Sequence, residues 1–287
     1  MAAMVIDSRN SDAFRRLAQS GKSVIHRLNG TEGFTLPGLM EVIASAVGSR
    51  SKGEVESELL RYISANSESP LKAGWDGWQI RTGSIFTSDM HGVRRFEFYR
   101  LRERDDQTNL TYQLFQERFV RSLQENEFPA KFANALAGVL VEITDNVIQH
   151  SLRESGEYEG LAAYHVERGY MAIAVVDLGQ GVLASLTRSP SWSHLQTSEE
   201  SLRAAVIDHA SGRAGQPEGE GFRFVLKSLA ERNCRLRFRS GDAALRIEEI
   251  KGVHDGVITG SPELCGLQVS ICCALKGLPE ERAIKIS

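Results

Sequence analysis

The sequence has few of the features that define membrane, disulfide-rich or zinc-binding proteins. Only 4 of its 287 residues are Cys, and none of them stands in a CxxC pair. We therefore expect no zinc site and no disulfide framework, and we predict reduced, mostly buried thiols. The adjacent Cys272 and Cys273 are expected to point to opposite faces of a strand. No apolar run approaches the ~18 residues that span a bilayer, and the N-terminus has no apolar signal segment, so we predict a cytoplasmic protein without membrane contact.

An excess of basic charge and a P-loop are also missing. The chain has 34 Lys and Arg against 37 Asp and Glu, a formal net charge of -3. Because domains that bind nucleic acid usually carry a positive field, we expect no nucleic-acid partner. The absence of a GxxxxGK[ST] motif excludes the phosphate-binding loop of P-loop proteins. With 41% hydrophobic and 25% charged residues, the composition is typical of a globular protein with one large or two smaller domains.

The sequence pattern changes at a polar segment, DDQTN, over residues 105–109. We place a domain junction there, which divides the chain into a smaller N-terminal α/β domain, 1–109, and a second domain, 110–287. In the first, apolar periodicity over 39–47 predicts a helix, and the alternation over 96–101 (FEFYRL) predicts a strand.

The most informative stretch of the second domain is ALAGVLVEITDNVIQH, from Ala135 to His150. Its apolar residues recur at helical spacing and predict a helix that faces the core. Its polar residues recur at spacings of three and four on one strip: Glu142, Asn146, Gln149 and His150. Carboxylate and amide oxygens, with no compensating cation, suit a hard cation such as Mg²⁺. A polar helix edge without any ligand fits the same pattern.

Two strands are predicted next, over 161–166 and 170–176. The second strand ends directly in Asp177-Leu178-Gly179-Gln180-Gly181. A carboxylate at this place accepts a hydrogen bond from a ligand, and Gly179 and Gly181 let the backbone approach it closely. A plain junction between strand and turn is the alternative.

A second pair of glycines, Gly219 and Gly221, opens a predicted helix over 222–232. Free N–H groups and the positive end of a helix dipole suit a phosphate. Lys227 on this helix is a candidate phosphate contact, although a solvated lysine fits the pattern better. The polar, Ser-rich segment 183–215 before it is expected to be a mobile lid.

Three arginines alternate along a later predicted strand and so share one of its faces: Arg235, Arg237 and Arg239. A solvated face, an intramolecular pairing surface, and a site for a partner or a phosphate all fit this pattern.

The order of three motifs resembles the GHKL superfamily of ATPases, which includes gyrase B subunits, histidine kinases and MutL. The motifs are Glu142-x-x-x-Asn146, Asp177-x-Gly179-x-Gly181 and Gly219-x-Gly221. The wording EITDNVIQHS is closest to the ATP-binding domains of histidine kinases and bacterial anti-sigma serine kinases. The resemblance covers about residues 112–277. It implies an α+β fold, a two-layer α/β sandwich of the Bergerat type, in which helices cover one face of a mixed, mostly antiparallel sheet.

The resemblance also implies a role for each motif. Asn146 would bind the Mg²⁺ that bridges the ATP phosphates, and Glu142 would orient or deprotonate an attacking water. Gly219 and Gly221 would let the lid and the helix N-terminus close over the phosphates. His150 and Lys227 are further candidate contacts of the nucleotide.

At the other end of the implied site, Asp177 would accept a hydrogen bond from the adenine amino group, and Gly179 and Gly181 would shape the base pocket. The sequence departs from the family pattern in three ways. Gly266-Leu267 stands where a Gly-Thr pair is common, the last glycine motif is a single GEG, and no phosphoacceptor His precedes the ATPase part. A complete sensor histidine kinase is therefore not expected.

Three functions remain open on this basis. The first is Mg-dependent ATP binding, with the nucleotide state regulating a protein partner. The second is a protein serine/threonine kinase of the anti-sigma type, and the third is an interaction module with a degenerate pocket. Relatives of this kind are often homodimers, and the phrase FTLPGLMEVI, 34–43, faintly resembles the STAS-like regions that accompany such ATPase domains in bacterial proteins.

Overall fold

The structure is a computed structural model, and it describes most of the chain. The described residues are 4–20, 23–48, 52–66, 69–79, 84–88, 95–101, 109–150, 160–208, 210, 220–230, 232–248, 250, 256–277 and 279–284. No helix among them is both long and apolar enough to cross a membrane.

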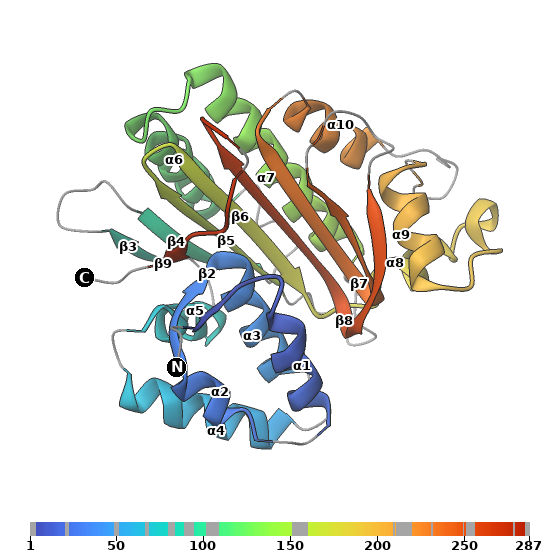
Figure 1. Ribbon diagram of the computed structural model, residues 1–287. Helices are drawn as coiled ribbons and strands as arrows, with labels where there is room; N and C mark the ends of the chain where they lie inside the picture. Colours follow the sequence, from blue (N-terminus) through green and yellow to red (C-terminus); the bar gives the residue numbers. More distant parts are fainter. Residues whose placement is uncertain are drawn as a thin grey trace.

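Two sheets organise the fold (Figure 1). The large sheet has the strand order β3-β4-β5-β6-β8-β7, and every neighbouring pair in it is antiparallel. Its strands are β3 (Ser84–Ser88), β4 (Arg95–Leu101), β5 (Gly160–Glu167), β6 (Tyr170–Asp177), β7 (Cys234–Ile247) and β8 (Val257–Ala274). The small sheet is mixed: β2 (Thr31–Thr35) pairs in parallel with β1 (Met4–Ile6) and antiparallel with β9 (Ala283–Ile284). With the helices described next, these sheets confirm the predicted α+β class.

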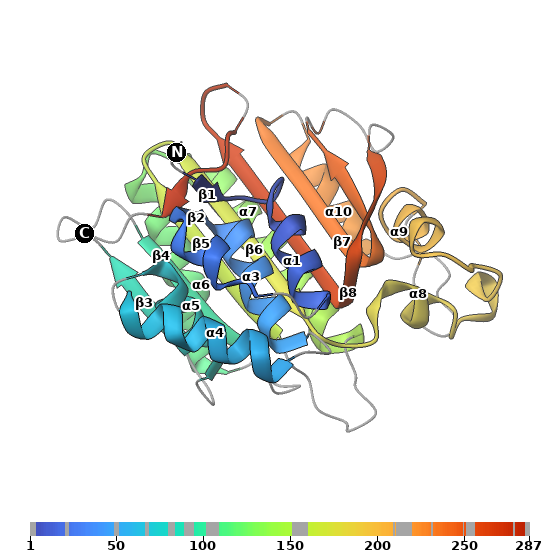
Figure 2. The ribbon, with the colours of Figure 1, turned by 60° about the horizontal axis from the view of Figure 1, so that its bottom comes forward.

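Helices cover both faces of the large sheet (Figure 2). On one side lie α1 (Ser11–Gln19), α2 (Ile25–Asn29), α3 (Leu36–Gly48), α4 (Lys52–Ala65) and α5 (Pro70–Gln79). On the other side lie α6 (Leu110–Glu125), α7 (Ala130–His150) and α10 (Glu220–Leu229). Alternate residues of β6 enter the two cores, Met171 and Ile173 on the α7 side and Ala172 and Ala174 on the α3 side. The N-terminal helices therefore form a third layer on the face that the resemblance leaves uncovered.

The predicted domain junction near residue 109 falls between β4 and α6. The large sheet continues across this point, because β4 pairs with β5 along its whole length, from Arg95 opposite Val166 to Leu101 opposite Gly160. The strand predicted over 96–101 is thus an inner strand of the large sheet. The division of the chain into two domains stays a prediction.

β7 folds back on itself. A side-chain ion pair of 2.9 Å joins Arg235 near its start to Glu248 just beyond its end. A straight strand would separate these residues by roughly 40 Å, so the chain must reverse between them. It does so at Gly241, whose φ of 59° is accessible mainly to glycine. The parts of β7 before and after Gly241 therefore lie close together.

The cysteines correct one prediction. Cys234 of β7 lies opposite Cys273 of β8, and a disulfide joins them. We expected reduced thiols because no two cysteines form a CxxC pair. The strand register nevertheless brings the Cα atoms of Cys234 and Cys273, 39 positions apart in the sequence, to 4.1 Å. The neighbouring Cys272 is buried on the other face of the sheet, which confirms the expected alternation.

We predict that a thiol reagent will titrate two cysteines per chain in denatured, unreduced protein and all four after reduction, because one disulfide consumes two of the 4 cysteines. Mass spectrometry of a non-reducing digest should find Cys234 linked to Cys273. Four reactive thiols in protein denatured without a reductant would contradict the disulfide.

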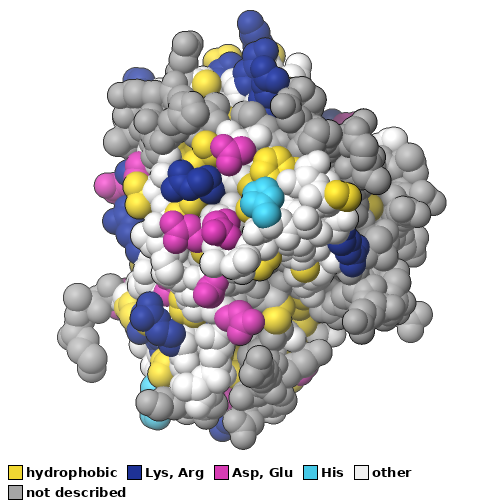
Figure 3. Space-filling view, turned by 90° about the vertical axis from the view of Figure 1, so that its right-hand side faces the viewer, with side chains coloured by type: hydrophobic (Ala, Val, Ile, Leu, Met, Phe, Trp, Pro, Cys, Tyr) yellow, Lys and Arg dark blue, Asp and Glu magenta, His cyan; other side chains and the backbone are white. Residues whose placement is uncertain are grey.

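The segment predicted as a lid is largely helical. It forms α8 (Gly181–Leu186), the 3-10 helix η2 (Pro190–Trp192) and α9 (Ser198–Val206). α9 begins with a capping box, in which the Thr197 hydroxyl accepts from the Glu200 N–H and the Glu200 carboxylate accepts from the Thr197 N–H. α9 packs on β7 through buried residues such as Leu202. The side of the molecule that these helices form carries interspersed acidic and basic side chains (Figure 3).

Candidate functional site

α7 carries the first motif, and its sequence explains its placement. All six apolar residues predicted to face the core are buried: Leu136, Val139, Leu140, Ile143, Val147 and Ile148. Because this stripe fixes the rotation of the helix, Glu142 and Asn146 lie at its edge, one turn apart and partly exposed. A carboxylate and a carboxamide therefore stand side by side on α7.

The first turn of α10 packs directly against the side chains of Glu142 and Asn146. A Cβ placed on Gly221 would lie 2.1 Å from Oε1 of Glu142 and 3.4 Å from Nδ2 of Asn146. Only glycine fits so close to the carboxylate without displacing it. α7 and α10 are also close at Gly138 and Phe224, because a Cβ on Gly138 would lie 3.0 Å from Cζ of Phe224. The structure thus brings Gly221 against Glu142 and Asn146.

The donor set fits a magnesium ion only together with a ligand. Nδ2 of Asn146 is buried and has no hydrogen-bond partner among the described residues. No group of three or more His, Cys, Asp and Glu side chains that could hold a metal occurs in the described part of the chain. Mg²⁺ takes few protein ligands and keeps waters or substrate phosphates for the rest. The oxygens of Asn146 and Glu142 therefore suit a metal that arrives with phosphates, and not a site built from protein alone.

Asp177, the last residue of β6, is 2% exposed. Its Oδ1 accepts a hydrogen bond of 2.6 Å from the Gly179 N–H, which ties the carboxylate to the turn that follows. Gly266 covers the same residue: a Cβ there would lie 2.5 Å from Oδ1 and 2.3 Å from the carbonyl oxygen of Asp177. Gly266 is therefore in direct contact with Asp177. It belongs to the Gly266-Leu267 pair, which stands where the family commonly has Gly-Thr.

Ser240, which the sequence did not indicate as a site residue, connects the segments around Asp177 through hydrogen bonds. The Ser240 hydroxyl donates to the Gly266 carbonyl at 2.7 Å and accepts from the Val182 N–H at 2.9 Å. It also lies 3.0 Å from where a Cβ of Gly181 would be, and Gly181 has a φ of 79°. Ser240 thus joins β7, β8 and the start of α8 beside Asp177. A serine just before a turn glycine is a weak signal in a sequence.

Asp177 and the motif on α7 lie at the same end of the sheet. Gly160 is the strand partner of Asp177. A Cβ on Gly160 would lie 2.9 Å from Cγ1 of Val147, the residue that follows Asn146. α7 also contacts α8, which begins at Gly181. Residues from all three sequence motifs therefore surround one end of the α7 face of the sheet.

Three predicted contacts are not placed in this site. Gly219 lies outside the described residues, and so does the side chain of His150, the last residue of α7. Lys227 is exposed in the last turn of α10, about 9 Å along the helix axis from Gly221. The roles of these residues stay predictions.

Comparison with known proteins adds no relative. No protein-family model matches the sequence, and no curated protein matches it. The resemblance to GHKL ATPases therefore depends on the three sequence motifs and stays a prediction.

Proposed function

We propose that the chain binds ATP with Mg²⁺ and that its nucleotide state regulates a protein partner. One observation carries the proposal: Gly221 lies against Glu142 and Asn146. These residues come from two motifs more than 70 positions apart, and the resemblance assigns both motifs to the phosphate end of a nucleotide. The contact has features of a phosphate site, with a carboxylate and a carboxamide beside the N-terminal turn of a helix.

The proposal gives each residue a task. Asp177 recognises the base, since its carboxylate is fixed by the Gly179 N–H at the end of the sheet. Asn146 offers its amide to the metal, and Glu142 is placed to orient a water. When bound, Mg²⁺ would neutralise phosphate charge.

A Bergerat-type arrangement is part of the same proposal. The antiparallel strands β5, β6, β8 and β7, together with α7 and α10 on one face, support it. The three motifs then lie on the α7 side of the sheet, at the ends of β6 and α7 and at the start of α10.

The test is a thermal melt with and without Mg·ATP. A ligand at ~100 times its Kd stabilises the folded state by roughly 2.7 kcal/mol, which raises the melting temperature measurably. We expect Asp177→Asn to remove this shift while its far-UV circular dichroism stays that of the wild type. Asp242→Asn, an exposed aspartate on β7, is the matched control and should keep the shift. An undiminished shift in Asp177→Asn would refute the assigned base contact.

A second function is favoured by a specific feature of the same contact. A carboxylate beside the first turn of a helix is stabilised by the helix dipole. Glu142 could therefore hold α10 in place with no nucleotide at all, as in an interaction module with a degenerate pocket. Absence of any melt shift with adenine nucleotides would favour this function. If ATP binds, transfer of its terminal phosphate to a co-purified protein would distinguish an anti-sigma-type kinase from a regulatory ATPase.

A further inference from the structure

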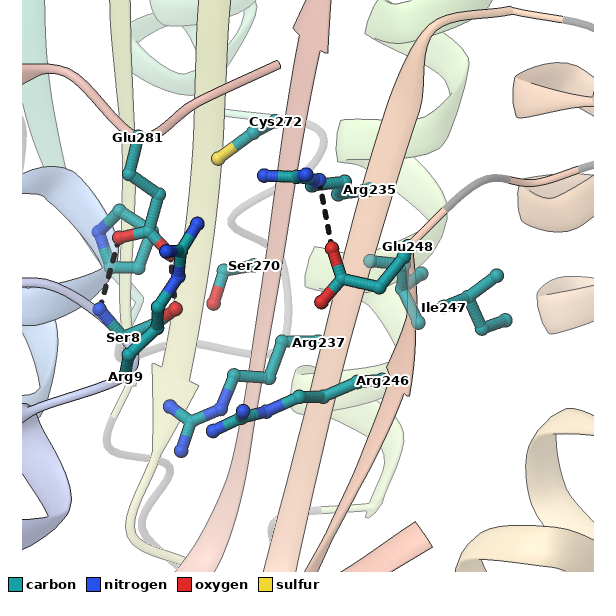
Figure 4. Close-up of a pocket in the computed structure, with 12 residues that line it drawn as sticks. Ser8, Arg9, Arg235, Arg237, Arg246, Ile247, Glu248, Ser270, Cys272 and Glu281 are labelled. Carbon is teal, nitrogen blue, oxygen red and sulfur yellow. Dashed lines mark hydrogen bonds and ion pairs between the residues drawn. The ribbon is translucent and has the colours of Figure 1, made fainter. Parts of the chain in front are cut away.

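A second candidate site lies on the opposite face of the large sheet, under the N-terminal layer (Figure 4). It is a small pocket of about 40 Å³ that is partly open to solvent. Its wall combines the segment after β1, strands β7 and β8, and the segment before β9. The cavity belongs to none of the three motifs that the proposed function uses.

Arginine dominates this wall. Arg9, Arg235, Arg237 and Arg246 all line it, against the carboxylates of Glu248 and Glu281. Arg235 is paired with Glu248 at 2.9 Å. Glu281 is engaged elsewhere, because it accepts hydrogen bonds from the Ser8 N–H at 3.0 Å and from the Thr35 hydroxyl at 2.6 Å. The residues that line the cavity therefore carry two more positive than negative charges.

Two of the four arginines have no carboxylate partner among the residues that the structure describes. Arg9 and Arg246 form no ion pair with any residue that the structure describes. Arg237 uses its two terminal nitrogens on Glu41 and Asp12, at 3.0 and 3.1 Å, and its Nε remains buried without a hydrogen-bond partner among the described residues. Nε of Arg246 is likewise buried and unpartnered within the described chain.

A buried hydroxyl faces the same space. Ser270 is 5% exposed, and its Oγ has no hydrogen-bond partner in the described part of the chain. It stands directly opposite Arg237 in the pairing of β7 with β8. In Figure 4, the side chains of Arg237 and Arg246 extend side by side in the same direction, and Ser270 lies above them. Burial most of all, and the charges of Arg239 and Arg246, lower the pKa of Arg237, although Glu41 and Asp12 act in the opposite sense.

We propose that this cavity binds a small oxyanion of the size of phosphate, held by Arg237, Arg246 and Ser270. Each of these residues presents an unused buried donor, and an anion satisfies all three at once. Guanidinium groups bind phosphate oxygens through directed N–H donors, and a negative charge between Arg237 and Arg246 removes their mutual repulsion. Arg9, exposed at the rim, adds a fourth cation. A metal cation is disfavoured by the same charges.

The experiment is isothermal titration of the full-length protein with inorganic phosphate at constant ionic strength. We expect saturable binding by the wild type. Arg246→Gln should weaken it by at least about tenfold, because a charge-assisted hydrogen bond is lost. Ser270→Ala removes only a hydroxyl and should weaken it by about threefold to tenfold. Arg203→Gln, an exposed arginine of α9, is the matched control and should bind as the wild type does.

Asp177→Asn should also bind phosphate with wild-type affinity, because its carboxylate lies in the other site. This result separates the oxyanion site from the proposed nucleotide site, whichever of the two fails. Circular dichroism shows whether each variant is folded. If Arg246→Gln does not fold, Ser270→Ala provides the test. Absence of saturable phosphate binding, or equal binding by wild type, Arg246→Gln and Ser270→Ala, would overturn the proposal.

Discussion

Replacing Glu41 by Gln is expected to lower the free energy of unfolding by about 3–5 kcal/mol, the usual cost of removing one partner from a buried ion pair. Glu41 lies on α3 and is 0% exposed. Its carboxylate contacts three guanidinium groups: Arg15 at 2.9 Å, Arg237 at 3.0 Å, and Arg239. This cluster joins the N-terminal helices to β7.

The loss is large because glutamine keeps the size of the side chain and removes its charge. Arg15, Arg237 and Arg239 are each 6% exposed or less, and among the described residues only Asp12 would remain to balance them. Urea denaturation of wild type and Glu41→Gln measures the difference. Glu32→Gln, on the exposed side of β2, is the control and should change stability by less than about 0.5 kcal/mol. An equal, small effect of both substitutions would show that the cluster does not stabilise the fold.

The same carboxylate predicts a pH dependence. Burial raises the pKa of Glu41, but the charges of Arg239, Arg15 and Arg237 outweigh burial and hold it well below its usual range. A folded-state pKa below the unfolded value of about 4.3 means that the stabilisation is complete above that pH and is lost as the pH falls below it. The difference in the free energy of unfolding between wild type and Glu41→Gln should therefore be smaller at pH 3 than at pH 7, because acid removes part of the advantage of the wild type.

Local periodicity was sufficient to predict the elements around the candidate site. The helix predicted over 135–150 lies within α7, and the strands predicted over 161–166 and 170–176 are β5 and β6. Each has a strong repeat that requires no knowledge of its neighbours. β6 is buried on both faces, and its unbroken apolar run is typical of such a strand.

Contacts between distant segments were not predictable in the same way. Arg237 and Arg239 share a strand face, which the alternation showed, but the sequence left a solvated face, a pairing surface and a ligand site open. The structure pairs both arginines with Glu41, about 200 positions away. The Cys234–Cys273 disulfide was missed for the same reason, since strand register decides it and spacing does not.

Replacing Gly266 by Ala is expected to destabilise the protein by roughly 2–6 kcal/mol, through two separate effects. Its φ of 83° costs a residue with a side chain on the order of 1–3 kcal/mol. The new Cβ would also lie 2.3 Å from the Asp177 carbonyl oxygen, and forcing atoms into a packed region costs about 1–3 kcal/mol more. Because β8 and β6 are paired, the backbone cannot relax without disturbing the sheet.

Two other glycines of the chain separate these effects. Gly277 has a φ of 67° and Gly260 has no positive φ, and a Cβ on either meets no atom within 4 Å. Gly277→Ala should therefore show the backbone strain alone, and Gly260→Ala should change the free energy of unfolding very little. If Gly266→Ala costs no more than Gly277→Ala in chemical denaturation, the contact with Asp177 contributes nothing. A larger cost shows that Gly266 and Asp177 are held in contact, and under the proposed function Gly266→Ala should then lose the Mg·ATP melt shift, because the base-binding carboxylate is displaced.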